Sequence, residues 1–232
     1  MIDFFFWTTP NGLKVLIALE EMGIEYRTST INISKGEQFG EEFLKISPNN
    51  KIPAIRDNSP ANDAAPITIF ESGAILFYLG EKTGTFLPKD LRGRVAAMEW
   101  LFWQVGGLGP MAGQTHHFRH YAPEKLPYAI DRYVRETGRL YGVLDKRLAG
   151  RDYILGDYSV ADMAAFPWVI DHGRQDLRLE DFPNVKRWFA AISARPAVIA
   201  ARAKSDAINT APNVNDQSRA ILFGQTHAGA KN

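Results

Sequence analysis

The stretch Ser47-Pro48-Asn49-Asn50-Lys51-Ile52-Pro53-Ala54, followed by Phe70-Glu71-Ser72-Gly73-Ala74, is the most informative part of the sequence. A cis bond between Ile52 and Pro53 would turn the N–H and C=O of Ile52 outward, free to pair with an extended peptide. Glu71 and Ser72 stand where a helical pattern begins, and a helix N-terminus binds anions. Together the two segments predict a pocket for a small peptide that has a carboxylate at one end.

Each segment also has an ordinary interpretation. Most X-Pro bonds are trans, so Ile52-Pro53 alone is compatible with a trans proline at the start of a strand. Glu71-Ser72 alone is a common way to begin a helix. Lys51 is equally compatible with a solvated surface charge. The functional interpretation therefore depends on the two segments occurring together.

Composition limits the kinds of partner that the chain can have. The 232 residues are 45% hydrophobic and carry a net charge of +1 from 27 basic and 26 acidic side chains. This balance argues against a nucleic-acid-binding surface, which needs an excess of basic residues. No apolar run approaches the roughly twenty residues of a membrane span, and the run at residues 2–6 is too short for a signal peptide. We therefore expect a cytoplasmic protein that binds neither nucleic acid nor membrane.

The chain has no cysteine. Structural disulfides, thiolate metal sites and a cysteine nucleophile are therefore excluded. If the protein carries out thiol chemistry, every sulfur atom that takes part must come from a ligand.

Strand and helix signals follow the order βαβ and then ββα, which is the plan of a thioredoxin-like domain. The elements are expected at residues 2–6, 10–22, 26–33, 54–55, 67–70 and 72–82. Strand signals then stop, which predicts an α/β domain followed by an all-α domain. The expected limits are a thioredoxin-like domain at 1–84, a linker at 85–90, an all-helical domain at 91–204 and a polar, loose tail at 205–232.

Three features organise the helical part. A helix from Leu91 to Val105 is expected to be interrupted at residues 106–110, where the sequence reads Gly-Gly-Leu-Gly-Pro. Pro127 suits the first position of a long helix that ends at Leu148. Ser159 and Asp162 have the spacing of a capping box, which predicts the start of a buried helix.

The paired motifs resemble the glutathione-binding half of the glutathione transferases. The resemblance extends from about Ile2 to Pro196, and it includes Thr8-Thr9-Pro10-Asn11-Gly12, Gly36-Glu37-Gln38-Phe39, the run from Trp100 to Phe118 and the run from Pro127 to Tyr133. Within the superfamily the chain is most similar to the bacterial nu-class branch, whose members have glutathione-dependent disulfide-bond reductase activity. The resemblance implies glutathione as co-substrate, a homodimer and no metal.

The resemblance also implies a role for each site residue. The bond between Ile52 and Pro53 is then cis, and the Ile52 backbone pairs with the cysteinyl part of glutathione. Ser72 holds the γ-glutamyl carboxylate, and Glu71 faces its ammonium group. Gln38 and Lys51 lie near the glycine end. Arg132 would reach the glutathione bound to the partner subunit, although an exposed arginine on a long helix is also the ordinary case.

The sulfur is expected at the turn that contains Thr9 and Asn11. These are ordinary turn and capping residues, but the resemblance implies that Asn11, and with it Thr9, donates hydrogen bonds to the glutathione sulfur. A free thiol has a pKa near 8.5, and a helix N-terminus with such hydrogen bonds favours the anion. A tyrosine hydroxyl is absent from the first strand, where residues 5–7 are Phe-Phe-Trp, and Ser34 is too distant in sequence.

Two groups of residues are candidates for the second-substrate cleft. His116 and His120 have i, i+4 spacing, but no carboxylate completes a metal motif, so a wall of the second-substrate cleft is preferred to a metal site. Aromatic residues at helical spacing usually belong to the core. The candidate apolar lining of this cleft consists of Trp7, Met111, Phe118, Phe166 and Trp168.

Two classes of function remain open. The first is an enzyme that uses the thiolate of bound glutathione to reduce disulfides, with conjugation to electrophiles and peroxide reduction as related activities. The second is a non-catalytic protein that uses the same fold to bind glutathione, another ligand or a partner. The sequence does not identify the second substrate or the number of glutathione molecules per site.

Overall fold

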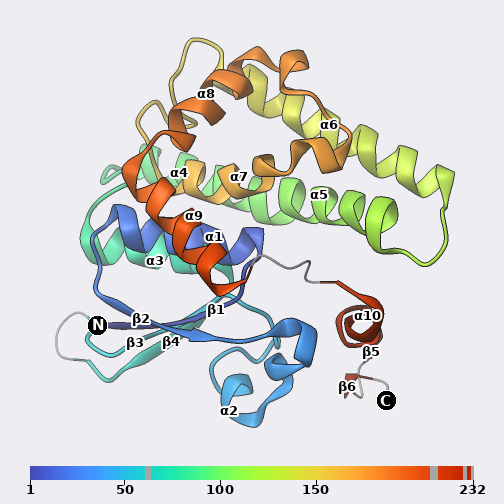
Figure 1. Ribbon diagram of the computed structural model, residues 1–232. Coiled ribbons are helices and arrows are strands. Elements are labelled where there is room, and N and C mark those ends of the chain that lie inside the picture. The colour runs from blue at the N-terminus through green and yellow to red at the C-terminus, as the bar shows by residue number, and fades with distance from the viewer. Residues whose placement is uncertain (61–63, 210–213, 227–228, 231–232) are drawn as a thin grey trace. The chain divides into compact units, whose positions relative to one another are not determined.

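We describe the protein from a computed structural model that describes residues 1–60, 64–209, 214–226 and 229–230 (Figure 1). The chain forms two compact units, residues 1–75 with 200–232, and residues 76–199. The division falls within two helices, α3 (Ser72–Thr83) and α9 (Pro196–Ile208), so the domain limits expected from the sequence stay a prediction. Residues 61–63 of the expected loop, and residues 210–213, 227–228 and 231–232 of the expected tail, lie outside the described part.

The first unit contains a four-stranded sheet in the order β2-β1-β3-β4. The strand β1 (Ile2–Phe6) is parallel to β2 (Tyr26–Thr30) and antiparallel to β3 (Ala54–Asp57), which pairs antiparallel with β4 (Ile67–Phe70). The helix α1 (Pro10–Glu21) connects β1 to β2 and lies across one face of the sheet (Figure 1). This arrangement confirms the thioredoxin-like plan and the predicted hairpin of β3 and β4.

The helix α1 approaches β1 closely because a glycine stands at their contact. A Cβ atom at Gly12 would lie 2.5 Å from the Trp7 carbonyl oxygen and 2.7 Å from the Phe6 ring. Such distances are well inside van der Waals contact, so only glycine fits there. The close approach buries almost the whole circumference of α1 from Lys14 to Leu19.

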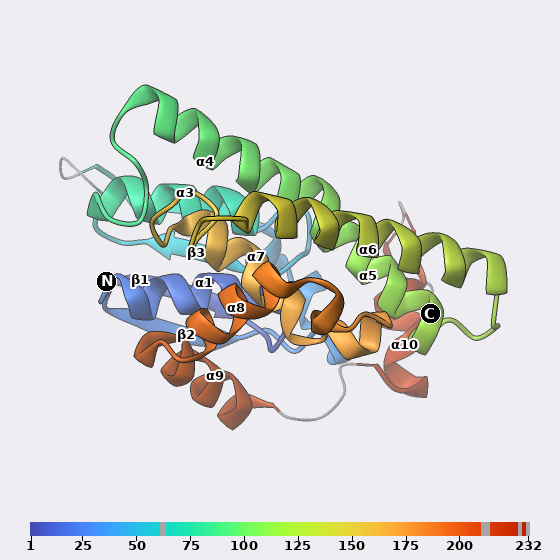
Figure 2. The ribbon, with the colours of Figure 1, turned by 90° about the horizontal axis from the view of Figure 1, so that it is seen from above.

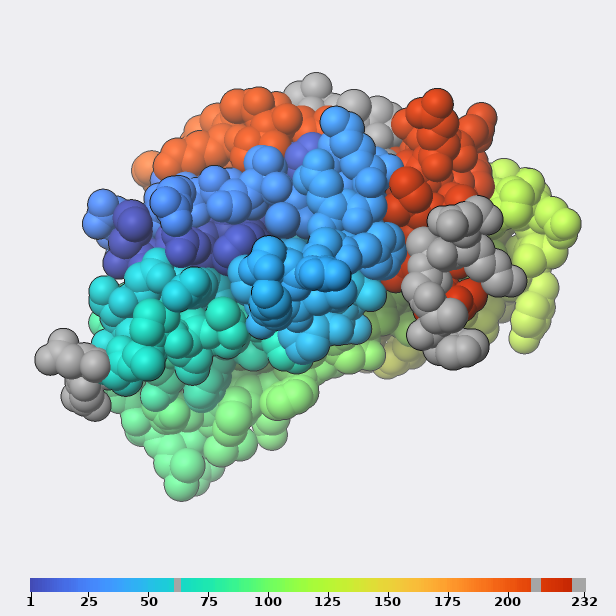
Figure 3. All heavy atoms as spheres, turned by 90° about the horizontal axis from the view of Figure 1, so that it is seen from below, coloured from blue at the N-terminus to red at the C-terminus, as the bar shows by residue number. Residues whose placement is uncertain are grey.

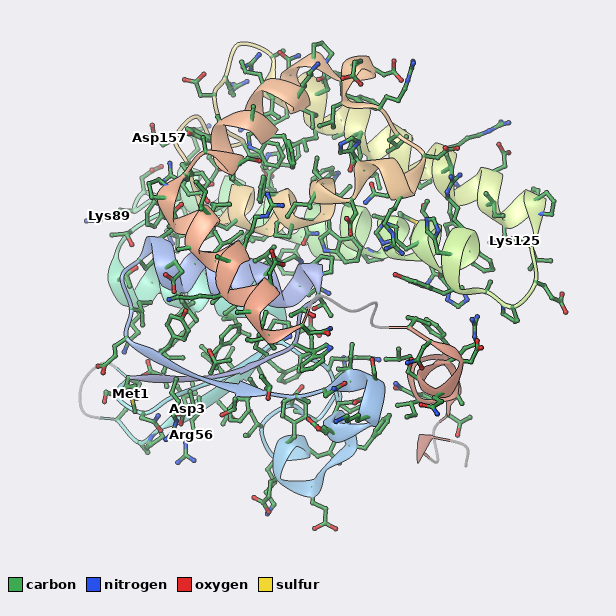
Figure 4. The ribbon with its side chains drawn as sticks, viewed as in Figure 1. Met1, Asp3, Arg56, Lys89, Lys125 and Asp157 are labelled. Carbon is green, nitrogen blue, oxygen red and sulfur yellow. The ribbon has the colours of Figure 1, made fainter. Side chains whose placement is uncertain are left out.

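Charged residues link the strands at the end of the sheet where β1 begins. The register places Asp3 opposite both Arg27 and Arg56, and Figure 4 shows Asp3 and Arg56 close together. The Asp3 carboxylate accepts hydrogen bonds from Arg27 Nη2 at 2.8 Å and from Asn58 Nδ2 at 2.9 Å. These bonds lower the pKa of Asp3, the Asn58 bond first. These hydrogen bonds to the Asp3 carboxylate therefore stabilise this end of the sheet.

Between β2 and β3 the chain makes short helical turns. These are η1 (Ile33–Lys35), η2 (Glu37–Phe39) and α2 (Glu41–Leu44). Gly36 joins η1 and η2 with φ +81°, a left-handed conformation that favours glycine.

The end of the chain differs from the loose tail that the sequence suggested. It contains the helix α10 (Asp216–Phe223) and a short pair of strands, β5 (Gln225–Thr226) and β6 (Gly229–Ala230). Asn215 and Ser218 form a capping box at the start of α10, and such a box satisfies two otherwise free backbone N–H groups. α10 contacts η1, and Figure 3 shows the red tail beside the blue residues that follow β2.

The second unit is helical. Its elements are the rest of α3, α4 (Leu91–Trp103), η4 (Gln104–Leu108), α5 (Gly109–His116), η5 (His117–Tyr121), α6 (Pro127–Leu148), α7 (Val160–Ile170), η6 (His172–Gln175), η7 (Leu179–Asp181), α8 (Pro183–Ser193) and the start of α9. α6 lies alongside α5 (Figure 2) and also contacts α8, while α7 contacts α4. The predicted helix from Pro127 to Leu148 is confirmed.

The expected break at residues 106–110 is wrong. The chain continues from α4 through a single wide π-helical turn, η4, directly into α5. Pro110 lies just after this wide turn, and a proline inside a helix removes one backbone hydrogen bond and crowds the carbonyl of the preceding turn. The glycines and the proline therefore widen the helix without ending it.

The predicted capping box at Ser159 and Asp162 is confirmed and belongs to a larger buried network. The Asp162 carboxylate accepts hydrogen bonds from the Ile154 N–H at 2.9 Å, the Ser159 N–H at 3.0 Å and Trp188 Nε1 at 2.8 Å. Burial raises the pKa of Asp162 to about 6, and these donors oppose the shift. The network joins the start of α7 to α8.

Within the residues that the structure describes, no helix is long and apolar enough to cross a membrane.

Candidate functional site

The strand register brings the predicted motifs to one edge of the sheet. β1 and β2 are parallel and end together, with Phe6 opposite Thr30, so the turn after β1 lies beside the segment that leads to Gln38. Phe5 is opposite Ala54, and Ala54 is opposite Phe70. The end of β1, the start of β3 and the end of β4 therefore meet. Eight of the nine predicted site residues follow or precede these strand ends: Thr9, Asn11, Gln38, Lys51, Ile52, Pro53, Glu71 and Ser72.

The turn after β1 presents a capped helix N-terminus. Thr9 is the N-cap of α1, and its Oγ1 accepts a hydrogen bond from the Gly12 N–H at 3.1 Å. A hydroxyl group that accepts through a lone pair keeps its own proton to donate. Pro10 takes the first helical position and Asn11 follows it, half-buried. The Thr9 hydroxyl, the Asn11 amide and the positive end of a helix thus lie together at this turn, and a helix N-terminus favours an anion.

The loop before β3 is held in a fixed conformation. The buried Ser47 hydroxyl donates a hydrogen bond to the Lys51 carbonyl oxygen at 2.8 Å, and the Asn50 N–H donates to the Ser47 carbonyl oxygen at 2.9 Å. The peptide bond between Ile52 and Pro53 is cis, as the resemblance to the glutathione transferases implied. Ile52 is half-buried and adjoins the first residue of β3, so its backbone lies at the shared edge.

Ser72 begins α3, and Glu71 directly precedes it. Glu71 has φ +69°, an uncommon left-handed conformation for a residue with a side chain, and its carbonyl oxygen accepts the N–H of Ile75 at 2.9 Å. Residues held in such conformations are concentrated at binding and catalytic sites. Glu71 is exposed, whereas Ser72 is only 6% exposed.

Lys14 was not among the site residues predicted from the sequence. This side chain is 1% exposed, and its Nζ lies 3.2 Å from the Ser72 hydroxyl oxygen. Burial lowers the pKa of Lys14 to about 7, and the nearby Glu71 opposes the shift. The contact links α1 to the start of α3. A lysine on a helix usually reaches solvent, so no local pattern marks it as buried; only its position inside the apolar run from Leu13 to Leu19 was a signal.

Gln38 and Lys51 are polar groups of different burial. Gln38 is 2% exposed, and its Nε2 donates to the Ile33 carbonyl oxygen at 3.3 Å. Its Oε1 is buried and has no hydrogen-bond partner among the described residues. Lys51 is exposed, partial burial lowers its pKa, and its Nζ lies 3.5 Å from Gln225 Oε1 of the tail. Gln38 therefore offers an acceptor, and Lys51 a positive charge.

Arg132 belongs to the second unit. It lies on α6, its side chain is 57% exposed, and its Nη1 is 3.8 Å from Glu136 Oε2. An ion pair of this length on an exposed face is weak, so the guanidinium group is accessible.

The histidines and the candidate lining residues of the second unit differ in burial: some belong to its core and others lie at its surface. Burial lowers the pKa of His116 to about 4, so its ring is neutral at physiological pH, and its buried Nε2 has no hydrogen-bond partner in the described part. His120 Nε2 lies 2.9 Å from the Arg174 carbonyl oxygen. Among the described residues no group of three or more His, Cys, Asp or Glu side chains is placed to hold a metal ion.

Phe166 is not a lining residue, contrary to the expectation. It is fully buried and packs against Phe189, with ring centroids 5.2 Å apart, so it belongs to the core of the second unit. Met111, Phe118 and Trp168 are half-buried, and Trp7 of the first unit is 9% exposed.

Comparison with known proteins agrees with this geometry. Residues 2–81 match the family model of the glutathione S-transferase N-terminal domain, and residues 110–196 match that of the C-terminal domain. The disulfide-bond oxidoreductase YfcG of Escherichia coli is 56% identical over 198 residues, which are 85% of this chain and 92% of the relative. The disulfide-bond oxidoreductase YghU of the same organism is 46% identical, over 82% of this chain and 70% of the relative.

Solved structures agree as well. A glutathione transferase of Burkholderia graminis, with two glutathione molecules bound per subunit, is 45% identical with a TM-score of 0.82, over 86% of each chain. One of Pseudomonas putida, with one glutathione disulfide bound per subunit, is 41% identical with a TM-score of 0.82, over 86% of this chain and 90% of that one. The sequence, the fold and these similarities together show that the chain belongs to the glutathione transferase family.

Proposed function

We propose that the protein is a glutathione-dependent disulfide-bond oxidoreductase that works through the thiolate of bound glutathione. One observation carries the proposal. At one edge of the sheet, the capped N-terminus of α1 lies beside the loop that contains the cis bond between Ile52 and Pro53, and the chain has no cysteine of its own. The names of YfcG and YghU, and the glutathione or glutathione disulfide bound in the solved relatives, support the same conclusion.

In this proposal Asn11 and Thr9 donate hydrogen bonds to the glutathione sulfur. The N-terminus of α1 adds its positive end, and together these groups favour the thiolate over the thiol. A pKa lower by one unit corresponds to about 1.4 kcal/mol, which a helix terminus with one or two hydrogen bonds can supply. No protein base is required.

The remaining residues hold the peptide. The Ile52 backbone, placed by Pro53, pairs with the cysteinyl part. Ser72 holds the γ-glutamyl carboxylate and Glu71 faces its ammonium group. Gln38 and Lys51 hold the glycine end, where Lys51 supplies a positive charge to the second carboxylate. The buried Oε1 of Gln38 can accept a hydrogen bond from a peptide N–H.

The reaction consists of two exchanges. The thiolate of the first glutathione attacks one sulfur of the substrate disulfide; a mixed disulfide forms, and the other substrate sulfur leaves as a thiolate that takes up a proton. A second glutathione thiolate attacks the glutathione sulfur of the mixed disulfide, which forms glutathione disulfide and releases the second substrate thiolate. Two glutathione molecules lose two electrons, and the substrate disulfide gains them.

We also propose that the working form is a cytoplasmic homodimer. Arg132 would then reach the glutathione bound to the partner subunit, and its exposed position on α6 supports this role. Conjugation and peroxide reduction would use the same thiolate.

The test is the reduction of 2-hydroxyethyl disulfide by glutathione, followed through glutathione reductase and NADPH. We expect turnover by the wild type and a fall in kcat/KM of about tenfold for Asn11→Ala, the equivalent of one pKa unit. Thr9→Ala tests the second proposed donor. Its matched control is Thr28→Ala, which replaces an exposed threonine on β2. Normal glutathione binding without turnover would instead favour a non-catalytic binding protein, and an unchanged kcat/KM in Asn11→Ala would exclude that residue as an important contributor.

A further inference from the structure

The buried lysine of α1 requires an explanation. Lys14 is 1% exposed in a helix whose other buried residues are apolar or glycine, and its ammonium group lies 3.2 Å from the hydroxyl oxygen of Ser72, itself 6% exposed. Burying a positive charge is unfavourable unless negative charge and hydrogen bonds compensate it. A buried cation beside a polar site is therefore a candidate for a role in that site.

The donor and acceptor properties of the two groups fix the direction of their hydrogen bond. An ammonium group has three donors and no acceptor, so the charged Lys14 donates and Ser72 Oγ accepts. The hydroxyl proton of Ser72 must then point elsewhere. A neutral Lys14 amine has a lone pair, so it could accept from Ser72 instead, and the orientation of the hydroxyl would no longer be imposed.

We propose that Lys14 is a positioning residue for the α-carboxylate of the γ-glutamyl group: its ammonium group turns the Ser72 proton toward the ligand and supplies the buried positive charge that the carboxylate requires. The inference rests on the proposed function, because it takes the γ-glutamyl group to bind at Glu71 and Ser72. The ligand is zwitterionic at this end, so its ammonium group would face Glu71 while its carboxylate meets Ser72 and Lys14. Two opposite charges of the protein would thus meet two opposite charges of the ligand.

This arrangement couples binding to a proton. Burial lowers the pKa of Lys14 to about 7, and Glu71 is the charged group that acts on it. A bound carboxylate stabilises the ammonium form and raises the pKa again. Around neutral pH the protein would therefore take up a proton when the ligand binds, and the affinity would be highest below about pH 7 and fall as the pH rises through the window above it.

The experiment uses S-methylglutathione as the ligand, because a thioether has no ionisable thiol to release a proton. Its binding to the full-length protein is measured by titration calorimetry in three buffers of different ionisation enthalpy near pH 7. We expect the wild type to take up about half a proton, because a group with a pKa of about 7 is half protonated there. From about pH 7 to 8 the affinity should fall by up to tenfold.

Lys14→Met removes the charge but keeps the length of the side chain, and Lys14→Arg keeps a charge that does not titrate. We expect the Met variant to bind at least about tenfold more weakly and to take up no proton, and the Arg variant to take up no proton whatever its affinity. Lys45→Met is the control: Lys45 is an exposed lysine of the same unit, and its loss should change neither quantity. Circular dichroism of each variant checks that it folds.

Two results would overturn the inference. One is wild-type binding without proton uptake and with an affinity that is constant from about pH 6.5 to 8. The other is a folded Met variant that keeps both the affinity and the proton uptake of the wild type. Either result leaves the proposed function intact, because S-methylglutathione still binds. A wild type that does not bind S-methylglutathione at all would refute the proposed function and this inference together.

Discussion

The two ends of the candidate site each carry a lysine, and the two lysines lie in opposite environments. Lys14 is buried in a regular helix, beside Ser72 and Glu71. Lys51 is exposed in a loop, and its Nζ is 3.5 Å from the neutral Gln225 side chain. Burial lowers the pKa of both, but only for Lys14 does it reach about 7.

The difference shows how burial decides what a charge can do. An exposed lysine stays protonated at neutral pH, is screened by salt and adds a modest attraction. A buried lysine costs stability, titrates near neutral pH and acts in a low dielectric, where its electrostatic effects are large. We therefore expect the γ-glutamyl end to respond to pH and the glycine end to respond to salt.

The largest effect expected from this comparison is on stability. At about pH 7 the unfolded chain keeps Lys14 protonated, with an ordinary pKa near 10.4, whereas the folded state must bury that charge or give up its proton. The folded state binds fewer protons, so the contribution of Lys14 is unfavourable below about pH 7 and is relieved as the pH rises from 7 toward 10. Lys14→Met should stabilise the protein at pH 7 by about 2 kcal/mol or more.

Urea unfolding of the wild type and the Met variant between about pH 7 and 9 measures this effect, and the difference between them removes the titration of other groups. The advantage of the variant should shrink by up to about 1.4 kcal/mol per pH unit. A difference that does not change with pH would show that the folded state does not lower the pKa of Lys14, and Lys51→Met should show almost no such dependence.

The second effect is on affinity at the γ-glutamyl end. Ser72→Ala removes the hydroxyl that lies between Lys14 and the proposed carboxylate, and a hydrogen bond to a charged group contributes about 1.5–3 kcal/mol. We expect the Kd for S-methylglutathione to rise by about tenfold to a hundredfold, with the Lys14-linked proton uptake reduced. Titration calorimetry measures both, and Ser29→Ala on β2 is the control. A Kd within twofold of the wild type would exclude Ser72 from binding the carboxylate.

The sequence motifs predicted the residues at the glycine end and at the γ-glutamyl end equally well. They did not predict which of these side chains are buried. Ile52, Pro53, Glu71 and Ser72 could be found because turns, a proline and a helix start leave local signals, and the same holds for Pro127 and for Ser159 with Asp162. Burial is a property of the folded chain, and only the position of Lys14 inside an apolar run distinguished it in the sequence from an exposed lysine.

The errors in the predicted fold have a similar cause. Residues 106–110 looked like a helix break because glycine and proline are poor helix formers, whereas tertiary packing maintains the helix through the wide turn η4. The tail looked loose because it has few large apolar residues, yet Asn215 and Ser218 cap α10, and Ile221 finds a partner far away in sequence, at Gly36.

The third effect is on affinity at the glycine end, where the exposed Lys51 can be compared with the buried Lys14. Lys51→Met should weaken glutathione binding by about threefold to tenfold at low salt, because an exposed charge pair contributes about 1 kcal/mol, and the loss should disappear in about 0.5 M NaCl. The ethyl ester of glutathione, whose glycine carboxylate is esterified and carries no charge, should bind the wild type and the variant equally. Calorimetry with both ligands measures this. A loss that persists at high salt would show that Lys51 acts as a buried charge, and the proposed difference between the two ends would not hold.

The smallest effect is expected from the contact of the tail. A Cβ atom at Gly36 would lie 3.7 Å from Ile221 Cγ2, so the Ile221 side chain rests against the turn between η1 and η2. Ile221→Asp puts a charge into this contact, which should release α10 at a cost of about 1 kcal/mol or less to global stability, since the helix packs only at the surface. Hydrogen exchange should then become faster in residues 33–39 and 216–223, while the amides of α1 keep their protection. Gln217→Ala, an exposed change on the same helix, should leave both segments unchanged. Equal exchange in wild type and Ile221→Asp would mean that the tail does not protect this end of the site, and faster exchange in α1 as well would mean that the two ends unfold as a single unit.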